Sequence, residues 1–136
     1  MSIKEKAIKK FTEKKYNCCQ AVVCAYCEEY GVSDETIFKL AEGFGGGMGG
    51  LQDACGAATG MFMALSMANS AGDKENPLVT KMDTYQKVAS AAKCFEKKCG
   101  SLYCRDIKQT VGGVQKVSCR ECVENGASIL EEYLER

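Results

Sequence analysis

The sequence predicts an all-α protein. Apolar residues recur three and four positions apart over long stretches, which is the spacing of an amphipathic helix. The chain holds one proline, and no run alternates apolar and polar residues with the β-branched enrichment of a strand. A chain of 136 residues with 46% apolar side chains can bury one core, so residues 1–136 are expected to form a single domain.

The elements expected are those of a single-domain helical bundle of five to six helices, with a glycine-rich loop before the central helix. The apolar pattern places these helices at 3–15, 18–30, 33–42, 54–69, 76–98 and 118–133, with a short turn or helix around 104–109. The helix at 54–69 is apolar nearly all round, which predicts a central position.

Local signals predict where these helices begin and end. The expected N-caps are Asn17, Ser33, Asp53 and Asn76, the last followed by Pro77 in the first turn. Ser118 and Glu121 form an S-x-x-E capping box. Glycine in a left-handed conformation commonly ends a helix, and Gly31 and Gly100 occupy such positions.

The charge balance excludes two classes of partner. Lysine plus arginine equals aspartate plus glutamate at 18 each, so neither nucleic acid nor an anionic membrane surface is expected to bind. The N-terminus is charged and has no apolar signal core, and the apolar stretch at 57–68 is too short to span a bilayer. We therefore expect a cytoplasmic protein.

Ten cysteines and no histidine define the chemistry that is available. The absence of histidine excludes imidazole-held haem, mixed Cys/His zinc fingers and Cys-His nucleophile pairs. In a reducing cytosol, a cysteine-rich chain is more often metal-binding or catalytic than stapled by disulfides.

Three cysteines fall in predicted first turns of helices: Cys18, Cys55 and Cys119. Free backbone N–H groups and the helix dipole stabilise negative charge there, which predicts a lowered thiol pKa. Cys104 shares this position if a helix follows Gly100. Cys19, Cys24, Cys27, Cys94 and Cys122 lie inside helices, where packing as small apolar residues is the simpler interpretation, and Cys99 is left open.

Two Cys-x-x-Cys pairs, Cys24 with Cys27 and Cys119 with Cys122, could in principle form a four-cysteine zinc site. The first pair lies inside a predicted helix, whereas zinc ribbons place such pairs on turns. Gly45, Gly47 and Gly50 have the G-x-G-x-x-G spacing, but that motif needs a preceding strand to bind a dinucleotide. The glycine segment is either a connector or a stretch of bare backbone beside a sulfur-ligated centre near Cys55.

Several segments together resemble the C_GCAxxG_C_C family of redox-active proteins, over Tyr16 to Leu134. They are Asn17-Cys18-Cys19-Gln20-Ala21-Val22, Gly43-Phe44-Gly45-Gly46-Gly47-Met48, Cys55-Gly56-Ala57-Ala58-Thr59-Gly60, Cys104-Arg105, and Cys119 with Val123. The resemblance implies a small helical redox protein with four signature cysteines. It also implies a link to iron-sulfur binding, which is associated with a related domain of cytochrome-like proteins.

Carried over by position, the signature cysteines are Cys18, Cys55, Cys104 and Cys119, which are the candidate catalytic and metal-binding residues. The candidate cofactor-binding residues are Gly46, Gly47 and Gly56. Cys19 and Cys122 lie outside the signature and are either packing residues or resolving thiols.

Three functions follow from these residues. The first is electron transfer by an iron-sulfur cluster, with [2Fe-2S] as the expected type because it needs four sulfur ligands and no histidine. The second needs no cofactor and is thiol-disulfide or peroxide chemistry, with a low-pKa thiolate such as Cys55 attacking. The third is a structural zinc site. A redox partner protein is expected for the first, and the apolar helical composition is compatible with a homodimer.

Overall fold

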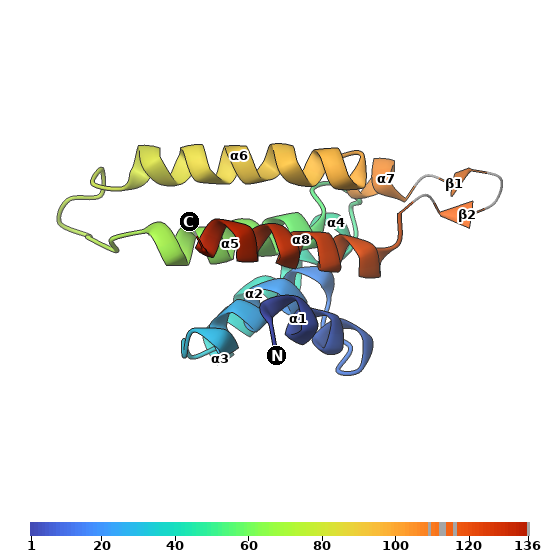
Figure 1. Ribbon diagram of the computed structural model, residues 1–136, viewed down its shortest axis with the longest axis horizontal. Helices are drawn as coiled ribbons and strands as arrows, with labels where there is room; N and C mark the ends of the chain where they lie inside the picture. Colours follow the sequence, from blue (N-terminus) through green and yellow to red (C-terminus); the bar gives the residue numbers. More distant parts are fainter. Residues whose placement is uncertain (109, 112–113, 116, 136) are drawn as a thin grey trace.

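A computed structural model describes residues 1–108, 110–111, 114–115 and 117–135, and it consists mainly of helices packed in three layers. Helices α5 and α8 form the middle layer, α6 covers one side, and α1 and α2 cover the other (Figure 1). The elements in chain order are α1 (Ile3–Thr12), α2 (Cys18–Glu29), α3 (Glu35–Ala41), the 3-10 turn η1 (Glu42–Phe44), α4 (Gly45–Met48), α5 (Gly56–Asn69), α6 (Lys81–Cys99), α7 (Cys104–Ile107), β1 (Thr110–Val111), β2 (Val114–Gln115) and α8 (Cys119–Leu134).

The all-α class is confirmed, but the number of helices is larger than predicted. Among the described residues, eight α-helices are present, of which α4 and α7 have only four residues each, and β1 pairs with β2 in a short antiparallel hairpin. The glycine-rich segment is a tight turn where a loop was expected. Gly46 and Gly47 have φ values of 63° and 72°, and the left-handed conformation continues through Gly50 at 80°.

Three helices begin at a complete capping box, in which the cap side chain and the side chain three residues later each accept a backbone N–H. Asn17 with Gln20 opens α2 and Ser118 with Glu121 opens α8, as predicted, and Ser2 with Glu5 opens α1. Gly100, at φ 88°, ends α6 in the left-handed conformation, as predicted. These signals are local, which is why the sequence was sufficient to predict the box at Ser118 and the cap at Asn17, although not the part that Gln20 plays.

Three predicted boundaries are wrong or shifted, and a fourth cannot be compared. The helix predicted at 3–15 ends at Thr12, since Lys15 has a positive φ of 63°. Asp34, not Ser33, stands before α3. The helix predicted from Asn76 begins at Lys81, because the Asp73 carboxylate accepts the N–H groups of Glu75 and Asn76 and holds this segment in a turn. The last residue of the short element predicted at 104–109, Gln109, lies outside the described residues.

Asp53 does not cap α5, and this correction matters for the site. The N-cap of α5 is Cys55, and the carbonyl of Asp53 instead accepts the N–H of Cys104 at 2.7 Å. Ala54 pairs with Tyr103 in an isolated antiparallel bridge, which keeps the chain before α5 extended. The start of α5 is therefore tied to the segment that precedes α7.

The predicted central position of α5 is confirmed, and small residues let its neighbours come close. A side-chain carbon at Gly60 would lie 2.7 Å from the Cys19 carbonyl oxygen of α2. A side-chain carbon at Gly126 of α8 would lie 3.0 Å from the Ala57 carbonyl oxygen of α5. Because only glycine permits such backbone approach, the N-terminal ends of α2, α5 and α8 meet at one end of the bundle.

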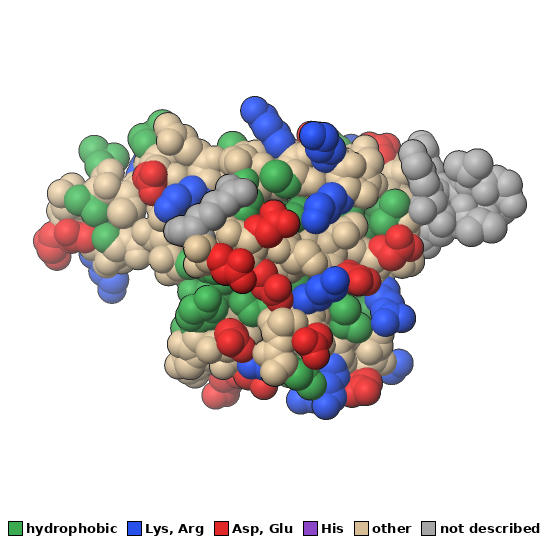
Figure 2. All heavy atoms as spheres, viewed as in Figure 1, with side chains coloured by type: hydrophobic (Ala, Val, Ile, Leu, Met, Phe, Trp, Pro, Cys, Tyr) green, Lys and Arg blue, Asp and Glu red, His purple; other side chains and the backbone are tan. Residues whose placement is uncertain are grey.

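The surface carries charges of both signs. On the face drawn in Figure 2, acidic and basic side chains lie among one another over the described part of the chain, in agreement with the equal totals of 18. No helix among the described residues combines the length and apolar character needed to cross a bilayer.

Candidate functional site

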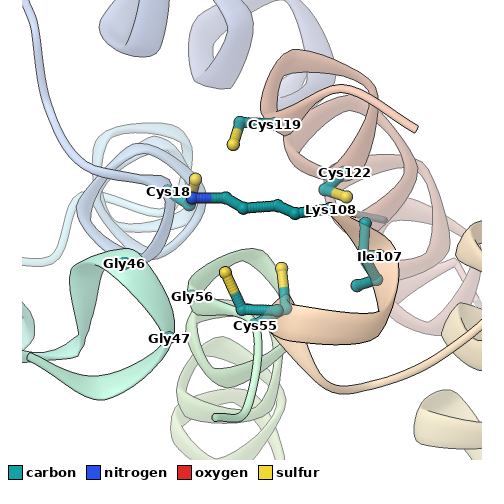
Figure 3. A pocket seen from close by; sticks show the side chains of 10 residues that line it. Cys18, Gly46, Gly47, Cys55, Gly56, Ile107, Lys108, Cys119 and Cys122 are labelled. Carbon is teal, nitrogen blue, oxygen red and sulfur yellow. The ribbon is translucent and has the colours of Figure 1, made fainter. Parts of the chain in front are cut away.

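A small cavity of about 60 Å³ lies where the first residues of α2, α5, α7 and α8 meet. Five thiols face it, together with glycine backbone and one lysine side chain (Figure 3). The residues that line it are Cys18, Gly46, Gly47, Cys55, Gly56, Cys104, Ile107, Lys108, Cys119 and Cys122. We call this cavity the thiol pocket.

All seven residues that the sequence singled out as candidates line the thiol pocket. The four signature cysteines come from four different helices, and the widest separation along the chain is from Cys18 to Cys119. The three candidate glycines come from α4 and the first residue of α5. The fold therefore gathers in one place residues that are far apart in the sequence.

Helix starts place each signature thiol. Cys18 and Cys119 are the first residues of α2 and α8, directly after the capping boxes, and both are half-buried. Cys104 is the first residue of α7, and Cys55 is the N-cap of α5. The predicted first-turn positions are thus found for Cys18, Cys104 and Cys119, whereas Cys55 is the N-cap itself and not the second residue after a cap at Asp53.

Glycine is required at two positions of the pocket wall. A side-chain carbon at Gly47 would lie 2.7 Å from the Cβ of Cys104 and 2.7 Å from the backbone nitrogen of Asp53. A side-chain carbon at Gly56 would lie 3.1 Å from the Cβ of Cys18. These distances are shorter than van der Waals contact, so the bare backbone is what lets these segments reach the thiols.

Backbone hydrogen bonds join the segments that carry Cys55 and Cys104. The N–H of Cys55 donates to the Leu102 carbonyl at 2.7 Å, and the N–H of Arg105 donates to the Gln52 carbonyl at 2.9 Å. The N–H of Asp53 donates to the Gly47 carbonyl at 2.9 Å, which extends the connection to the glycine turn. The two thiols therefore keep a fixed relation to each other.

The Cys55 thiol has a lowered pKa of about 7. A hydrogen bond from the Cys122 thiol makes the largest contribution, and the backbone N–H groups of Ala57 and Ala58 in the first turn of α5 add to it. Burial acts in the opposite direction but is outweighed. The lowered pKa predicted for Cys55 is thus found, but its largest cause is the Cys122 thiol and the helix start contributes less.

The same prediction is wrong for Cys18 and Cys104. A hydrogen bond with Cys119 and burial raise the pKa of Cys18, because a second thiolate so close is unfavourable. Burial raises the pKa of Cys104, although Lys108 acts to lower it. For these two thiols, burial and the presence of neighbouring thiols raise the pKa by more than the helix start lowers it.

Lys108 is a pocket residue that the sequence did not indicate. Its side chain runs across the pocket toward Cys18 (Figure 3), and it hydrogen-bonds to Cys104. Thiolates at Cys119 and Cys104 raise the pKa of this ammonium group, so it remains protonated. Among the described residues that line the pocket, Lys108 alone supplies a positive charge.

Cys122 is a second pocket residue outside the signature. It lies three residues after Cys119 on α8, so both thiols point from the same face of that helix. The Cys122 thiol hydrogen-bonds to Cys55 in the pocket and to Cys99 behind it. The Cys-x-x-Cys spacing was the sequence signal for this residue, but packing was the simpler interpretation.

Comparison with known proteins shows which family this sequence matches. Residues 16–133 match the protein family described as "Putative redox-active protein (C_GCAxxG_C_C)". The chain belongs to this family. A relative from Archaeoglobus fulgidus, named only "Uncharacterized protein", is 32% identical over 114 residues, which cover 79% of this chain and 76% of that protein. No solved structure matches the chain.

The other cysteines lie away from the pocket lining of this C_GCAxxG_C_C protein. Cys19, Cys24 and Cys27 are fully buried in α2, and the Cys19 sulfur lies 3.8 Å from that of Met63. Burial raises the pKa of Cys19 to about 11 and that of Cys24 to about 12, so both behave as packed thiols. The pair Cys24 and Cys27 therefore does not join Cys119 and Cys122 in one site.

No group of three or more cysteine, aspartate or glutamate side chains in the described part of the chain is spaced to hold a single metal ion. A structural zinc would need four ligands at about 2.0–2.3 Å from one point. The thiols instead stand around a cavity.

Proposed function

We propose that this protein carries electrons by means of an iron-sulfur cluster held by Cys18, Cys55, Cys104 and Cys119 in the thiol pocket. The observation that carries the proposal is the convergence of these four thiols, from four helices, on one cavity. Iron-sulfur clusters are held by four cysteine thiolates, and the donor set in this pocket meets that requirement without histidine. The family description as redox-active agrees with this role.

The cavity between the thiols favours a cluster over a single ion. One zinc ion would draw all four sulfurs to a common point, whereas a cluster distributes its ligands over two or more iron atoms. Sulfurs placed around a cavity of about 60 Å³ fit the second case. A cluster with two irons and two sulfides, the [2Fe-2S] type, is the smallest that uses four cysteines.

The chain's own residues would bind and tune such a group. When bound, an iron-sulfur cluster accepts and releases single electrons. Gly46, Gly47 and Gly56 let the backbone lie close to the sulfur atoms, and Lys108 offsets part of the negative charge of four thiolates. Cys55 and Ile107 are buried and keep water from this side of the pocket, and access of water is one of the factors that set the reduction potential of a cluster.

Anaerobic purification tests this proposal directly. Iron and acid-labile sulfide are assayed together with visible absorption, before and after reconstitution. We expect iron and sulfide in equal amounts and a brown protein. Cys104→Ala should lose the colour, while the matched control Cys24→Ala, a buried cysteine in α2, should keep it. A reconstituted protein without colour or iron would exclude the cluster.

A second function is favoured by the contact between Cys55 and Cys122. A thiolate of Cys55 can attack a small disulfide, and Cys122 can then resolve the mixed disulfide. In the overall reaction, one small disulfide oxidises the two protein thiols; the products are two small thiols and a Cys55–Cys122 disulfide.

Reduction of a chromogenic aromatic disulfide by the metal-free protein tests this function. We expect Cys55→Ala to abolish the reaction and Cys24→Ala to leave it unchanged. Equal rates in all three proteins would rule out this chemistry.

A further inference from the structure

Three thiols form a continuous series from the thiol pocket into the core. Cys55 is a signature residue in the pocket wall, Cys122 hydrogen-bonds to it, and Cys99 hydrogen-bonds to Cys122. Cys99 ends α6, while Cys122 lies in α8, so the series crosses from α5 through α8 to α6. Neither Cys99 nor Cys122 belongs to the signature.

The two ends of this series differ in access. Cys55 and Cys122 line the cavity, whereas Cys99 does not, and Cys99 and Cys122 are each only 2% exposed. The Nδ2 group of Asn125 lies 3.4 Å from the Cys99 sulfur and donates to it. Asn125 is on the same helix as Cys122, so α8 positions both partners of Cys99.

We propose that Cys55, Cys122 and Cys99 form a thiol relay that passes an oxidising equivalent from the pocket to a buried Cys99–Cys122 disulfide and returns Cys55 to the free thiolate. The oxidant is a hydroperoxide of small size, with hydrogen peroxide as the simplest member. The relay operates in the chain without a bound cluster, so it goes beyond the electron-transfer role proposed above.

The first step takes place in the pocket. The Cys55 thiolate attacks one oxygen of hydrogen peroxide, an S–O bond forms, the O–O bond breaks, and the departing hydroxide takes up a proton to become water. A cavity of about 60 Å³ admits a molecule of this size, since one water occupies about 30 Å³ in the liquid. Cys55 lines this cavity as the N-cap of α5, where the first-turn N–H groups of Ala57 and Ala58 hydrogen-bond to its sulfur.

Two exchange steps follow. The Cys122 thiol, which hydrogen-bonds to Cys55, attacks the Cys55 sulfenic acid; an S–S bond forms while the Cys122 proton passes to the departing hydroxyl, which leaves as water. The Cys99 sulfur then attacks Cys122, its proton passes to solvent, and Cys55 leaves as a thiolate. The sum is one hydrogen peroxide and two thiols giving one disulfide and two waters.

The direction of the last step follows from the positions of the sulfur atoms. Cys99 and Cys122 are each only 2% exposed, so a disulfide between them is shielded from attack by thiols in solvent, whereas Cys55 lines the cavity. Asn125 stabilises the attacking Cys99 sulfur. As a result, the proposed cluster ligand Cys55 is again a free thiol, and the disulfide joins Cys99 and Cys122, which are not cluster ligands.

Disulfide mapping of the full chain tests the relay. Reduced, metal-free protein is treated with one equivalent of hydrogen peroxide, free thiols are alkylated, and peptides are identified by mass spectrometry. We expect a Cys99–Cys122 link, with Cys55 alkylated. A Cys55 sulfinic acid, or a disulfide of Cys55 with Cys18, with no Cys99–Cys122 link, would overturn the proposal.

Two variants and one control separate the steps. Cys99→Ala should stop at a Cys55–Cys122 disulfide, and Cys122→Ala should accumulate oxidised Cys55 without any disulfide to Cys99. Cys24→Ala, a buried cysteine outside the series, should give the wild-type pattern. If Cys99→Ala proves unfolded by circular dichroism, the wild-type map alone still decides, because it requires the Cys99–Cys122 link.

A second measurement distinguishes this proposal from the cluster. After peroxide treatment, wild-type protein should still take up iron and sulfide without a reductant, whereas Cys99→Ala should need one. Absence of iron in every sample would exclude the cluster but leave the disulfide map valid. An iron-binding protein that forms no Cys99–Cys122 link would exclude the relay alone.

Discussion

Cys55 and Cys18 have similar positions at helix starts but opposite pKa shifts. Cys55 accepts hydrogen bonds from Cys122 and from the N–H groups of Ala57 and Ala58, which favour the thiolate. Cys18 shares a hydrogen bond with Cys119 and is half-buried, and both features disfavour the Cys18 thiolate. The neighbours of each thiol, and not the helix start alone, therefore decide which thiol ionises first.

A pH titration of alkylation tests this difference at Cys55. A pKa of about 7, against an ordinary value of 9.0, means that Cys55 is a thiolate from about neutral pH upward. Since only the thiolate reacts, iodoacetamide labelling of Cys55 in the metal-free protein should rise with a midpoint near pH 7. Peptide mass spectrometry at each pH measures this rate.

The matched variant for that titration is Cys122→Ala. It removes the hydrogen bond that contributes most to the lowered pKa, so the midpoint should move to higher pH. A midpoint near 9 in the wild type, or no shift in Cys122→Ala, would contradict the assigned cause.

Lys108 should set the reduction potential of a bound cluster. Removing a positive charge makes the addition of an electron less favourable, so Lys108→Met should lower the midpoint potential. A unit charge roughly 5 to 14 Å away at an effective dielectric constant near 20 predicts a change of roughly 50 to 150 mV. Redox titration followed by visible absorption measures it.

Two lysine variants serve as controls for Lys108. Lys108→Arg keeps the charge and should stay near the wild-type potential, and Lys98→Met removes an exposed charge on α6 that does not line the pocket. An unchanged potential in Lys108→Met would show that solvent screens this charge.

At the scale of the elements, local signals were predictable and tertiary ones were not. The capping boxes at Asn17 and Ser118 depend on residues three apart, so the sequence was sufficient to place α2 and α8. Asp53 is a residue type that commonly caps helices. Its carbonyl, however, accepts the N–H of Cys104, the first residue of α7, and the next residue, Ala54, forms an extended bridge with Tyr103. No local pattern contains that pairing.

The site divides in the same way. The four signature cysteines and three glycines were found from their pattern, and the structure brings them together. Lys108 was not predicted, because its place in the pocket depends on how α7 meets α2 and α8. Cys122 and Cys99 were also indistinguishable from packing cysteines until their contacts were known.

The left-handed glycine turn gives a prediction for an element. Gly47→Ala places a methyl group 2.7 Å from the Cys104 Cβ at a φ of 72°, so it should both strain and displace the turn. Left-handed backbone for a residue other than glycine costs of order 1–3 kcal/mol, to which this clash adds. We expect a lower free energy of unfolding in urea and loss of iron binding after reconstitution.

Gly50→Ala is the control, because Gly50 has a φ of 80° but open space around its side-chain position. Gly50→Ala should lower the free energy of unfolding because of its left-handed backbone, but it should bind iron as the wild type does. Equal iron binding by Gly47→Ala and wild type would show that the turn does not shape the pocket.

At the scale of the whole molecule, the bundle core and the thiol pocket are separate sources of stability. The largest buried side chains, among them Phe95, Met61, Ile129 and Leu130, lie in α5, α6 and α8 and do not line the pocket. Burial of such side chains contributes about 1.5–3 kcal/mol each, so the bundle does not depend on a metal for its core.

Removal of the metal should therefore lower the stability without unfolding the protein. A cluster available at a free concentration of about 1,000 times its dissociation constant would add about 4 kcal/mol, which for a chain of 136 residues corresponds to roughly 14 °C in Tm. Far-UV circular dichroism of the metal-free protein at 25 °C should keep the helical spectrum, with the Tm reduced. A structural zinc site predicts the opposite, because such domains lose their fold with the metal. Loss of the helical spectrum on chelation would thus favour a structural metal, and an identical Tm with and without metal would mean that the four helix starts hold no cluster between them.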